Sequence, residues 1–253
     1  IFDYAERMHQ PCVINFSEGS SQDFHGYDQL YYELLAKLIG PGRIIVSSAG
    51  NDGARNSYIH KNIGKERAGA FIMGNEKRFS CTAKSKQTFT FRVSVYDNVA
   101  SPQIVDISTV NVCNAQDSLL TDSLLVGGKK YIWRVLAYPN SYDTSETAYD
   151  FQISSPSKLG DSPQVSLQVM GRDADIELYR MSGYMFPHSL DPVLDAGDCR
   201  YTIFSPSSSP DVICVGSTSY RTQFVNYLGE KKVYDSGQKG IRSSFSAMGP
   251  TLD

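Results

Sequence analysis

The pattern of apolar and polar positions changes character twice along this chain of 253 residues. Val13-Ile14 and Ile44-Ile45-Val46 are short unbroken apolar runs, and Leu30, Leu34 and Leu38 between them fall on one helical face. Apolar strands that alternate with helices are typical of parallel sheets buried on both faces. This part of the chain therefore predicts strand, helix, strand in an α/β arrangement.

From about Gly69 to Gly183 a period of two replaces the helical spacing, as in Tyr131, Trp133 and Val135. Several short alternating segments separated by turn residues predict an antiparallel β-sandwich or jelly roll. An unbroken apolar run then returns at Val212-Ile213-Cys214-Val215. One insertion explains both changes, so the predicted fold class is α/β: a partial parallel-sheet core over 1–61 and 197–253, interrupted by an inserted β-sandwich over 62–196.

The charge balance and the length of the apolar runs argue against nucleic acid and membranes as partners. Lys and Arg number 24 against 27 Asp and Glu, giving a formal net charge of −3. Such a balance provides no basic surface for nucleic acid, and no apolar run approaches the roughly 20 residues that span a bilayer. We expect a soluble chain without a nucleic-acid partner or a membrane span. The segment Ile1–His9 lacks the pattern of a signal peptide and predicts a helix already under way.

The five cysteines form no CxxC pair, so neither a zinc site nor a thioredoxin-type centre is expected. Cys12 and Cys214 lie in apolar runs and are interpreted as buried, and disulfide pairing stays open. Asp191, Asp195 and Asp198 cluster near the second change of pattern, but their spacing matches no EF-hand loop. No cofactor or metal site is evident, and Ca²⁺ is left open for a longer parent protein.

Four short segments occur in a recognisable order. They are VINFSEG at 13–19, IIVSSAGNDG at 44–53, PDVICVGS at 210–217 and RSSFSAMGP at 242–250. In this order they resemble segments of the subtilisin-like serine proteases, the subtilases or peptidase family S8. The resemblance covers residues 1–61 and 197–253, and it implies the central fragment of a secreted or cell-envelope bacterial hydrolase with a subtilisin-like core.

The resemblance also implies roles for individual residues. Asn51 corresponds to the oxyanion-hole asparagine, whose carboxamide donates to the carbonyl oxygen that becomes negative in the tetrahedral intermediate. Two segments imply substrate contacts, one forming a pocket wall and one pairing with an extended substrate as an added strand. These residues are Ser17, Glu18, Gly19, Ser48, Ala49 and Gly50. Local propensity offers a rival interpretation, because Asn-Asp-Gly is also a common turn and Ser-Glu-Gly-Ser a common solvated loop.

The catalytic triad of that family has no counterpart in the chain. The motifs HGTH and GTSMA are absent, and His9, His25, His60 and His188 are interpreted as surface or structural residues. Without a nucleophile and its base no acyl-enzyme forms. The implied function is a fragment of a serine endopeptidase that is inactive alone, with a peptide or protein as the substrate of its parent.

Two other functions stay open at this point. One is a pseudoprotease that acts as a scaffold or regulator. The other is a binding module in which the tyrosine-rich sandwich recognises glycan or protein while the α/β part only supports it. A Rossmann-type nucleotide enzyme is poorly supported, because no GxGxxG follows either early strand. Oligomeric state is not predicted.

Overall fold

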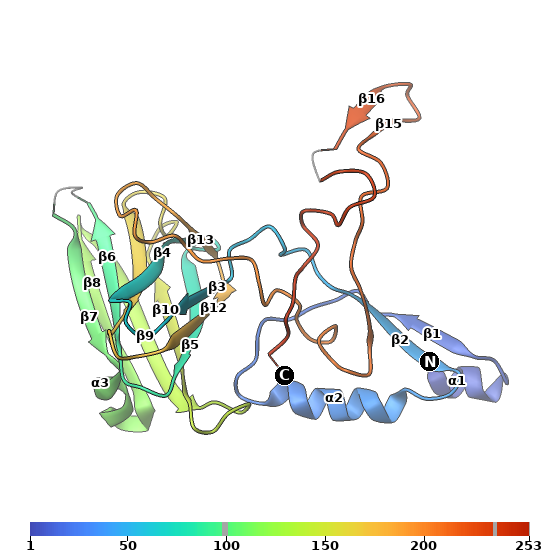
Figure 1. Cartoon of the computed structure of the whole chain (residues 1–253), viewed down its shortest axis with the longest axis horizontal. Helices are drawn as coiled ribbons and strands as arrows, with labels where there is room; N and C mark the ends of the chain where they lie inside the picture. Colours follow the sequence, from blue (N-terminus) through green and yellow to red (C-terminus); the bar gives the residue numbers. More distant parts are fainter. Residues whose placement is uncertain (98–100, 235–236, 253) are drawn as a thin grey trace. The chain divides into compact units, whose positions relative to one another are not determined.

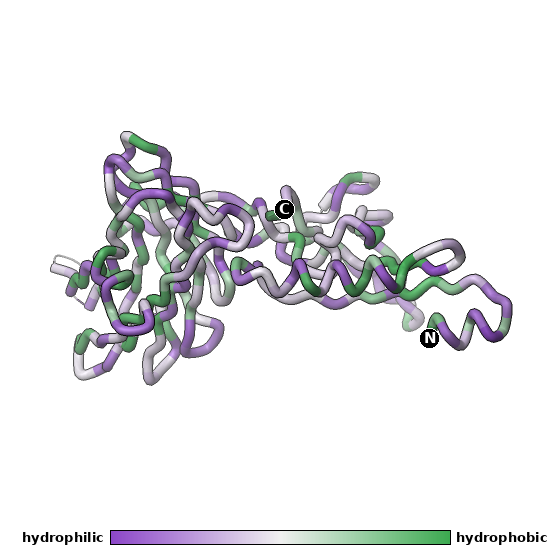
Figure 2. The backbone as a smooth tube through the Cα atoms, turned by 90° about the horizontal axis from the view of Figure 1, so that it is seen from below, coloured by the Kyte–Doolittle hydropathy of each residue, from purple (hydrophilic) through white to green (hydrophobic). Residues whose placement is uncertain are grey.

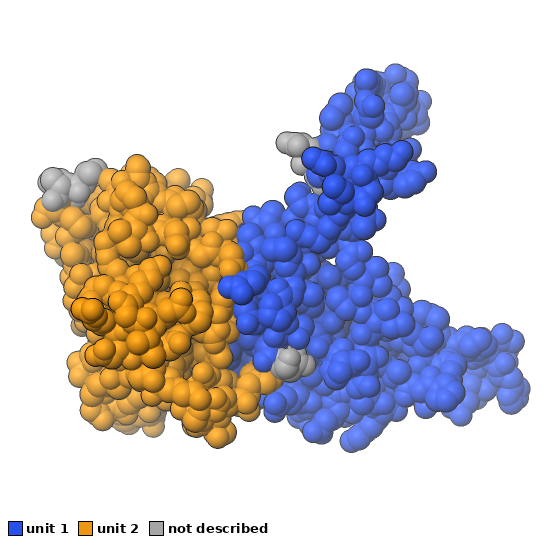
Figure 3. All heavy atoms as spheres, in the orientation of Figure 1, with its two compact units in different colours: residues 1–55, 199–253 blue, residues 56–198 orange. Residues whose placement is uncertain are grey.

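The computed structural model describes residues 1–97, 101–234 and 237–252. The chain divides into two compact units, which are coloured separately in Figure 3. Unit 1 comprises residues 1–55 and 199–253, and unit 2 comprises residues 56–198. The sequence placed residues up to 61 in the first part, but Tyr58–Lys61 pair with Ile176–Tyr179 and so belong to unit 2.

Unit 1 contains a three-stranded parallel sheet, two helices and a hairpin (Figure 1). The sheet has the order β1-β2-β14. Its elements are α1 (Phe2–Arg7), β1 (Cys12–Asn15), α2 (Tyr27–Leu38), β2 (Arg43–Ser48), β14 (Ile213–Val215), β15 (Gln223–Val225) and β16 (Lys231–Val233). β15 and β16 pair with each other in an antiparallel hairpin.

The helices of unit 1 cover one face of the parallel sheet. Leu35 of α2 packs with Ile45 of β2, and Phe2 and Val212 complete this small core. Val13, Ile44, Ile213 and Val215 are exposed. Hydrophobic and hydrophilic positions alternate along α2 (Figure 2). Its expected buried stripe is nevertheless wrong, because Leu30, Leu34 and Leu38 are exposed and Tyr31, Tyr32 and Leu35 pack on the core.

Unit 2 is built from two antiparallel sheets. The six-stranded sheet has the order β3 (Tyr58–Lys61), β12 (Ile176–Ser182), β5 (Arg78–Ser85), β10 (Thr147–Ser154), β9 (Lys129–Pro139) and β8 (Leu119–Val126). The five-stranded sheet has the order β13 (Tyr184–Phe186), β4 (Arg67–Met73), β11 (Gln164–Met170), β6 (Thr90–Tyr96) and β7 (Gln103–Ser108). A short helix α3 (Thr109–Asn114) and the 3-10 turn η1 (Gln116–Ser118) join β7 to β8.

The facing side chains of these two sheets form one hydrophobic core. Along β9, Trp133 and Val135 are buried, whereas Ile132 is 45% exposed. This alternation follows from the strand period of two, which sends successive side chains to opposite faces. Phe91 of β6 stacks on Phe151 of β10 with ring centroids 5.4 Å apart, so the two sheets contact each other through aromatic rings.

The predicted fold class has to be corrected. Sheet strands in the described residues are mostly antiparallel, and parallel pairing is confined to β1, β2 and β14. An α/β core needs helices on both faces of a parallel sheet. The unbroken apolar runs at 13–14, 44–46 and 212–215 predict strands buried on both faces, but Val13, Ile44, Ile213 and Val215 are exposed on one face. The chain is therefore a mainly antiparallel β protein with a small parallel sheet. Of the described helices, none combines the length and the apolar character that crossing a membrane requires.

Candidate functional site

The loops that follow β1 and β2 leave the parallel sheet at the same edge. The two strands are aligned in register, with Asn15 beside Val46, and the Phe16 N–H donates to the Val46 carbonyl at 2.8 Å. Ligands of parallel sheets commonly bind in the crevice outside the carboxyl ends of the strands. Residues just beyond Asn15 and Ser48 are therefore the first place to look for a binding site in unit 1.

A pocket of about 250 Å³ lies at this edge. It brings together all of the site residues that the sequence singled out, namely Ser17, Glu18, Gly19, Ser48, Ala49, Gly50 and Asn51. Four residues that the sequence did not single out complete the lining: Ser20, Asp52, Thr202 and Phe204. The pocket lies entirely within unit 1.

Asn51 occupies an exposed position on the loop after β2. Within the described residues its side-chain amide has no hydrogen-bond partner, so both its donor and its acceptor are open to a ligand. The preceding Gly50 has a φ of +110°, a left-handed conformation that glycine adopts without strain. The Gly50 carbonyl accepts from the Ala247 N–H at 3.1 Å, which ties the loop to the segment 243–248.

Gly53 anchors the other end of this loop. Its N–H donates to the Phe245 carbonyl at 2.9 Å, and a Cβ added to it would lie 1.9 Å from the Ser246 oxygen. Because this contact is so short, no residue other than glycine fits at position 53. The loop that carries Asn51 is thus held at both Gly50 and Gly53 by one distant segment.

Thr202 joins the same segment to the pocket. It is buried, its N–H donates to the Met248 carbonyl at 2.9 Å, and its hydroxyl accepts from the Met248 N–H at 2.8 Å. On the other wall, the Ser20 N–H donates to the Ser205 carbonyl at 3.2 Å. Such contacts join residues far apart in the sequence, and no local motif marks Thr202 or Phe204 as pocket residues.

The charges around the pocket are acidic or paired. Glu18 is exposed, whereas Asp52 forms an ion pair with Arg55 at 2.8 Å. Burial raises the pKa of Tyr31, and the negative charges of Glu18 and Asp28 raise it further, which places Glu18 near α2. Since the lining residues described include no lysine or arginine, the pocket suits neutral or cationic groups.

The histidines, the cysteines and the aspartates at 191, 195 and 198 all lie outside the lining of this pocket. His60 lies on β3 in unit 2 and donates from Nε2 to Asp175 at 2.6 Å, and neither it nor any other histidine lines the pocket. Asp191 binds Arg67, and Asp195 accepts from the Gly197 N–H. Over residues 1–97, 101–234 and 237–252, no three His, Cys, Asp or Glu side chains gather as a metal site.

All five cysteines lie in the described residues and are free. The expected burial of Cys214 is wrong, because its side chain is exposed on β14, and Cys12 is only partly buried. Both residues lie on the face of the sheet that carries Ile45, since Cys12 packs against that small core and Cys214 stands beside Ser47. They are nevertheless accessible because β1 and β14 are the edge strands of the described parallel sheet.

Comparisons with known proteins show a fold likeness alone. No protein-family model matches the chain, and no curated protein matches it. Among solved structures, the Clostridium perfringens CspB protease is similar with a TM-score of 0.61 and 16% sequence identity. The match covers 98% of this chain and 47% of that one, so the chain spans about half the length of the protease.

These findings correct the family assignment. The segments at 13–19, 44–53, 210–217 and 242–250 resemble subtilases, but no family model matches the chain, and 16% identity to one protease carries no family membership. Short strand-and-turn segments of this kind recur on different folds, because they satisfy local backbone requirements. The interpretation as a fragment of a subtilisin-like serine endopeptidase is withdrawn with it.

Proposed function

We propose that unit 1 binds an extended peptide in the pocket beyond β1 and β2, and that the chain is part of a peptidase. The observation that carries this proposal is the unpaired carboxamide of Asn51 beside the open strand end at Ser17–Gly19. The structural likeness to a protease supports the second half of the proposal. Because the chain spans about half the length of that protease, peptidase activity is proposed for a longer protein that contains this chain.

The geometry suits a peptide backbone for two reasons. A segment that continues from a strand can pair with an extended peptide through backbone hydrogen bonds, which is strand addition. On the opposite wall, the Asn51 amide can donate to a peptide carbonyl oxygen, and its loop is already held by Gly50 and Gly53. Because both walls are fixed before binding, little conformational entropy is lost when a peptide enters.

The pocket itself suits a small or medium side chain. Its volume is about 250 Å³, and Ser48, Ala49 and Gly50 present little bulk. Phe204 contributes an apolar contact, and Glu18 favours a neutral or cationic neighbour over an anionic one.

A titration tests the proposal without requiring turnover. Dye-labelled insulin B chain is titrated with the 253-residue chain, and binding is followed by fluorescence anisotropy. Asn51→Ala is expected to weaken binding about 3- to 10-fold, the usual effect of one lost hydrogen bond. Asn111→Ala, at an exposed position on α3, is the matched control and is expected to bind like the wild type. Equal binding by Asn51→Ala, or no binding by the wild type, would refute the assignment.

A further inference from the structure

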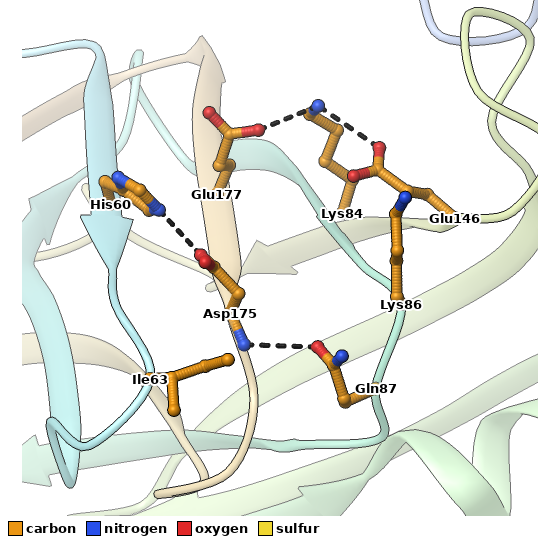
Figure 4. Close-up of a pocket in the computed structure, with 8 residues that line it drawn as sticks. All are labelled: His60, Ile63, Lys84, Lys86, Gln87, Glu146, Asp175 and Glu177. Atoms are coloured by element: carbon orange, nitrogen blue, oxygen red, sulfur yellow. Dashed lines mark hydrogen bonds and ion pairs between the residues drawn. The ribbon is translucent and has the colours of Figure 1, made fainter.

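A second pocket lies within unit 2, on the outer side of the six-stranded sheet (Figure 4). Its volume is about 430 Å³. Three cross-strand neighbours form its wall, because Glu177 of β12 stands opposite His60 of β3 on one side and Lys84 of β5 on the other. No local sequence pattern marks this pocket, since its lining residues come from four separate segments.

The charged side chains of this second pocket are largely paired, and its lining contains two lysines, Lys84 and Lys86, and three carboxylates, Glu146, Asp175 and Glu177. Lys84 Nζ lies 2.7 Å from Glu177 Oε2 and 3.1 Å from Glu146 Oε2 (Figure 4). His60 Nε2 donates to Asp175 Oδ1 at 2.6 Å. Burial lowers the pKa of Lys84, but the hydrogen bond and charge of Glu177, together with those of Glu146, raise it more. An ionic ligand therefore meets a weak net field.

Several polar atoms of the pocket are nevertheless left open. Asp175 Oδ2, Glu146 Oε1 and Gln87 Nε2 have no hydrogen-bond partner within the described residues. Two of these atoms accept hydrogen bonds and one donates. A hydroxyl group can donate and accept at once, and therefore complements such a mixed set better than a pure donor or a pure acceptor does.

The apolar rim of the pocket and its already ordered side chains also favour a ligand with hydroxyl groups on a ring. Ile63 is 61% exposed at the rim and offers an apolar contact to the C–H face of a ring. Gln87 Oε1 accepts from the Asp175 N–H at 3.2 Å, so the amide is held with its Nε2 open. Side chains that are already ordered lose little entropy on binding.

We propose that this pocket binds a neutral carbohydrate, with Gln87, Asp175 and Glu146 hydrogen-bonding its hydroxyl groups and Ile63 contacting its ring. The site is open and its contacts are few, so affinity for a disaccharide is expected to be weak, with a Kd of roughly millimolar order. This binding is independent of the peptide pocket, which lies in unit 1.

Ligand-observed and protein-observed NMR on the full chain test the proposal. The probes are cellobiose, maltose and N,N′-diacetylchitobiose, with free lysine, glutamate and inorganic phosphate as ionic probes. At least one disaccharide is expected to show saturation transfer and to shift the Gln87 side-chain amide. If none of the three binds, or if an ionic probe binds the pocket more tightly than they do, the proposal is wrong.

Variants locate the binding. Gln87→Ala and Ile63→Ser are each expected to weaken the disaccharide about 3- to 10-fold, and Gln103→Ala on the exposed edge of β7 is the matched control. Ile63 is exposed, so its change leaves the fold intact and keeps the test valid if Gln87→Ala unfolds. Unchanged affinity in Ile63→Ser together with unchanged affinity in a folded Gln87→Ala would place the sugar elsewhere and overturn the proposal.

Discussion

Single residues fix the shape of the peptide pocket, and Gly53 is the clearest example. Its α-carbon approaches the backbone of Ser246 so closely that an added Cβ would lie 1.9 Å from the Ser246 oxygen. The neighbour is backbone and cannot rotate away. The conformation of the loop that carries Asn51 therefore depends on the absence of a side chain at position 53.

Gly53→Ala is expected to lower the free energy of unfolding of unit 1 by about 1–3 kcal/mol, as overpacking of a close contact does. It should also weaken peptide binding, because the loop has to move. Urea unfolding followed by hydrogen exchange in β1 and β2 measures the first effect. Gly19→Ala is the control, since its nearest atom would be 4.0 Å away. A Gly53→Ala protein as stable as Gly19→Ala would contradict this account.

Some residues of the pocket beyond β1 and β2 could be predicted from the sequence, and others could not because their contacts are long-range. Asn51 and Gly50 could be singled out because a turn after an apolar strand is encoded locally. Thr202 is held at the pocket by the hydrogen bond from the Met248 N–H to its hydroxyl. These residues are 46 positions apart, so no local sequence pattern predicts the contact. The second pocket escaped prediction for the same reason, since His60 and Asp175 meet across 115 positions.

At the scale of elements, the alternating segments were predictable and the helix orientation was not. A period of two defines a strand with one buried face, so Trp133 and Val135 could be assigned to the core of β9. On α2 the apolar residues cover more than one face, and spacing alone could not decide whether Leu34 or Leu35 points inward. In the structure Leu35 is buried and Leu34 is exposed. The predicted α/β class is wrong for a related reason, because an unbroken apolar run does not show whether one face of a strand or both are buried.

Two isoleucines of the sandwich, one buried and one exposed, test the assigned strand alternation. Ile153 on β10 is fully buried, with 0% exposure, and Ile104 on β7 is 49% exposed. Ile153→Ala is expected to cost about 2–5 kcal/mol of unfolding free energy, whereas Ile104→Ala should cost less than about 1 kcal/mol. Chemical denaturation monitored by the fluorescence of Trp133 measures both. Similar costs for the two variants would show that the strand alternation is misassigned.

The ion cluster on the six-stranded sheet predicts a dependence of stability on pH. Burial raises the pKa of Glu177, but hydrogen bonds from Lys84 and Tyr58 lower it more, so the pKa lies below its usual value of 4.5. The folded state then binds fewer protons than the unfolded state near this value. The stabilisation is present above about pH 4.5 and is lost as the pH falls through the folded pKa.

Glu177→Gln removes this titration. The variant is expected to lose less unfolding free energy than the wild type between neutral pH and the acid range, although it is less stable at neutral pH. Denaturation curves across pH measure the difference, with Glu66→Gln, an exposed carboxylate outside the cluster, as the control. Parallel curves for Glu177→Gln and the wild type would contradict the role given to Glu177.

For the whole molecule, the two units have hydrophobic cores of different size. Among the described residues, 30 buried apolar residues form the core of unit 2 and 4 form that of unit 1. Hydrophobic stabilisation grows with the apolar area removed from water. The two units should therefore differ in stability, with unit 1 the weaker.

Two probes separate the units. Trp133 is the single tryptophan and lies in β9, so its fluorescence reports unit 2. Backbone amides of β1 and β14 are expected to exchange with solvent at lower denaturant concentrations than those of β5 and β9. Hydrogen-exchange mass spectrometry across a denaturant series measures both sets in one sample. Simultaneous loss of protection in all four strands would indicate a single cooperative unit instead.

Occupation of the pocket beyond β1 and β2 by a peptide can be mapped on the protein itself. Photo-cross-linking of the full chain with insulin B chain carrying a benzophenone, followed by mass spectrometry, maps the contact directly. Cross-links are expected at residues 17–20 and 48–52, and excess unlabelled B chain should suppress them. Suppressible cross-links confined to unit 2, or none at all, would contradict peptide binding in this pocket.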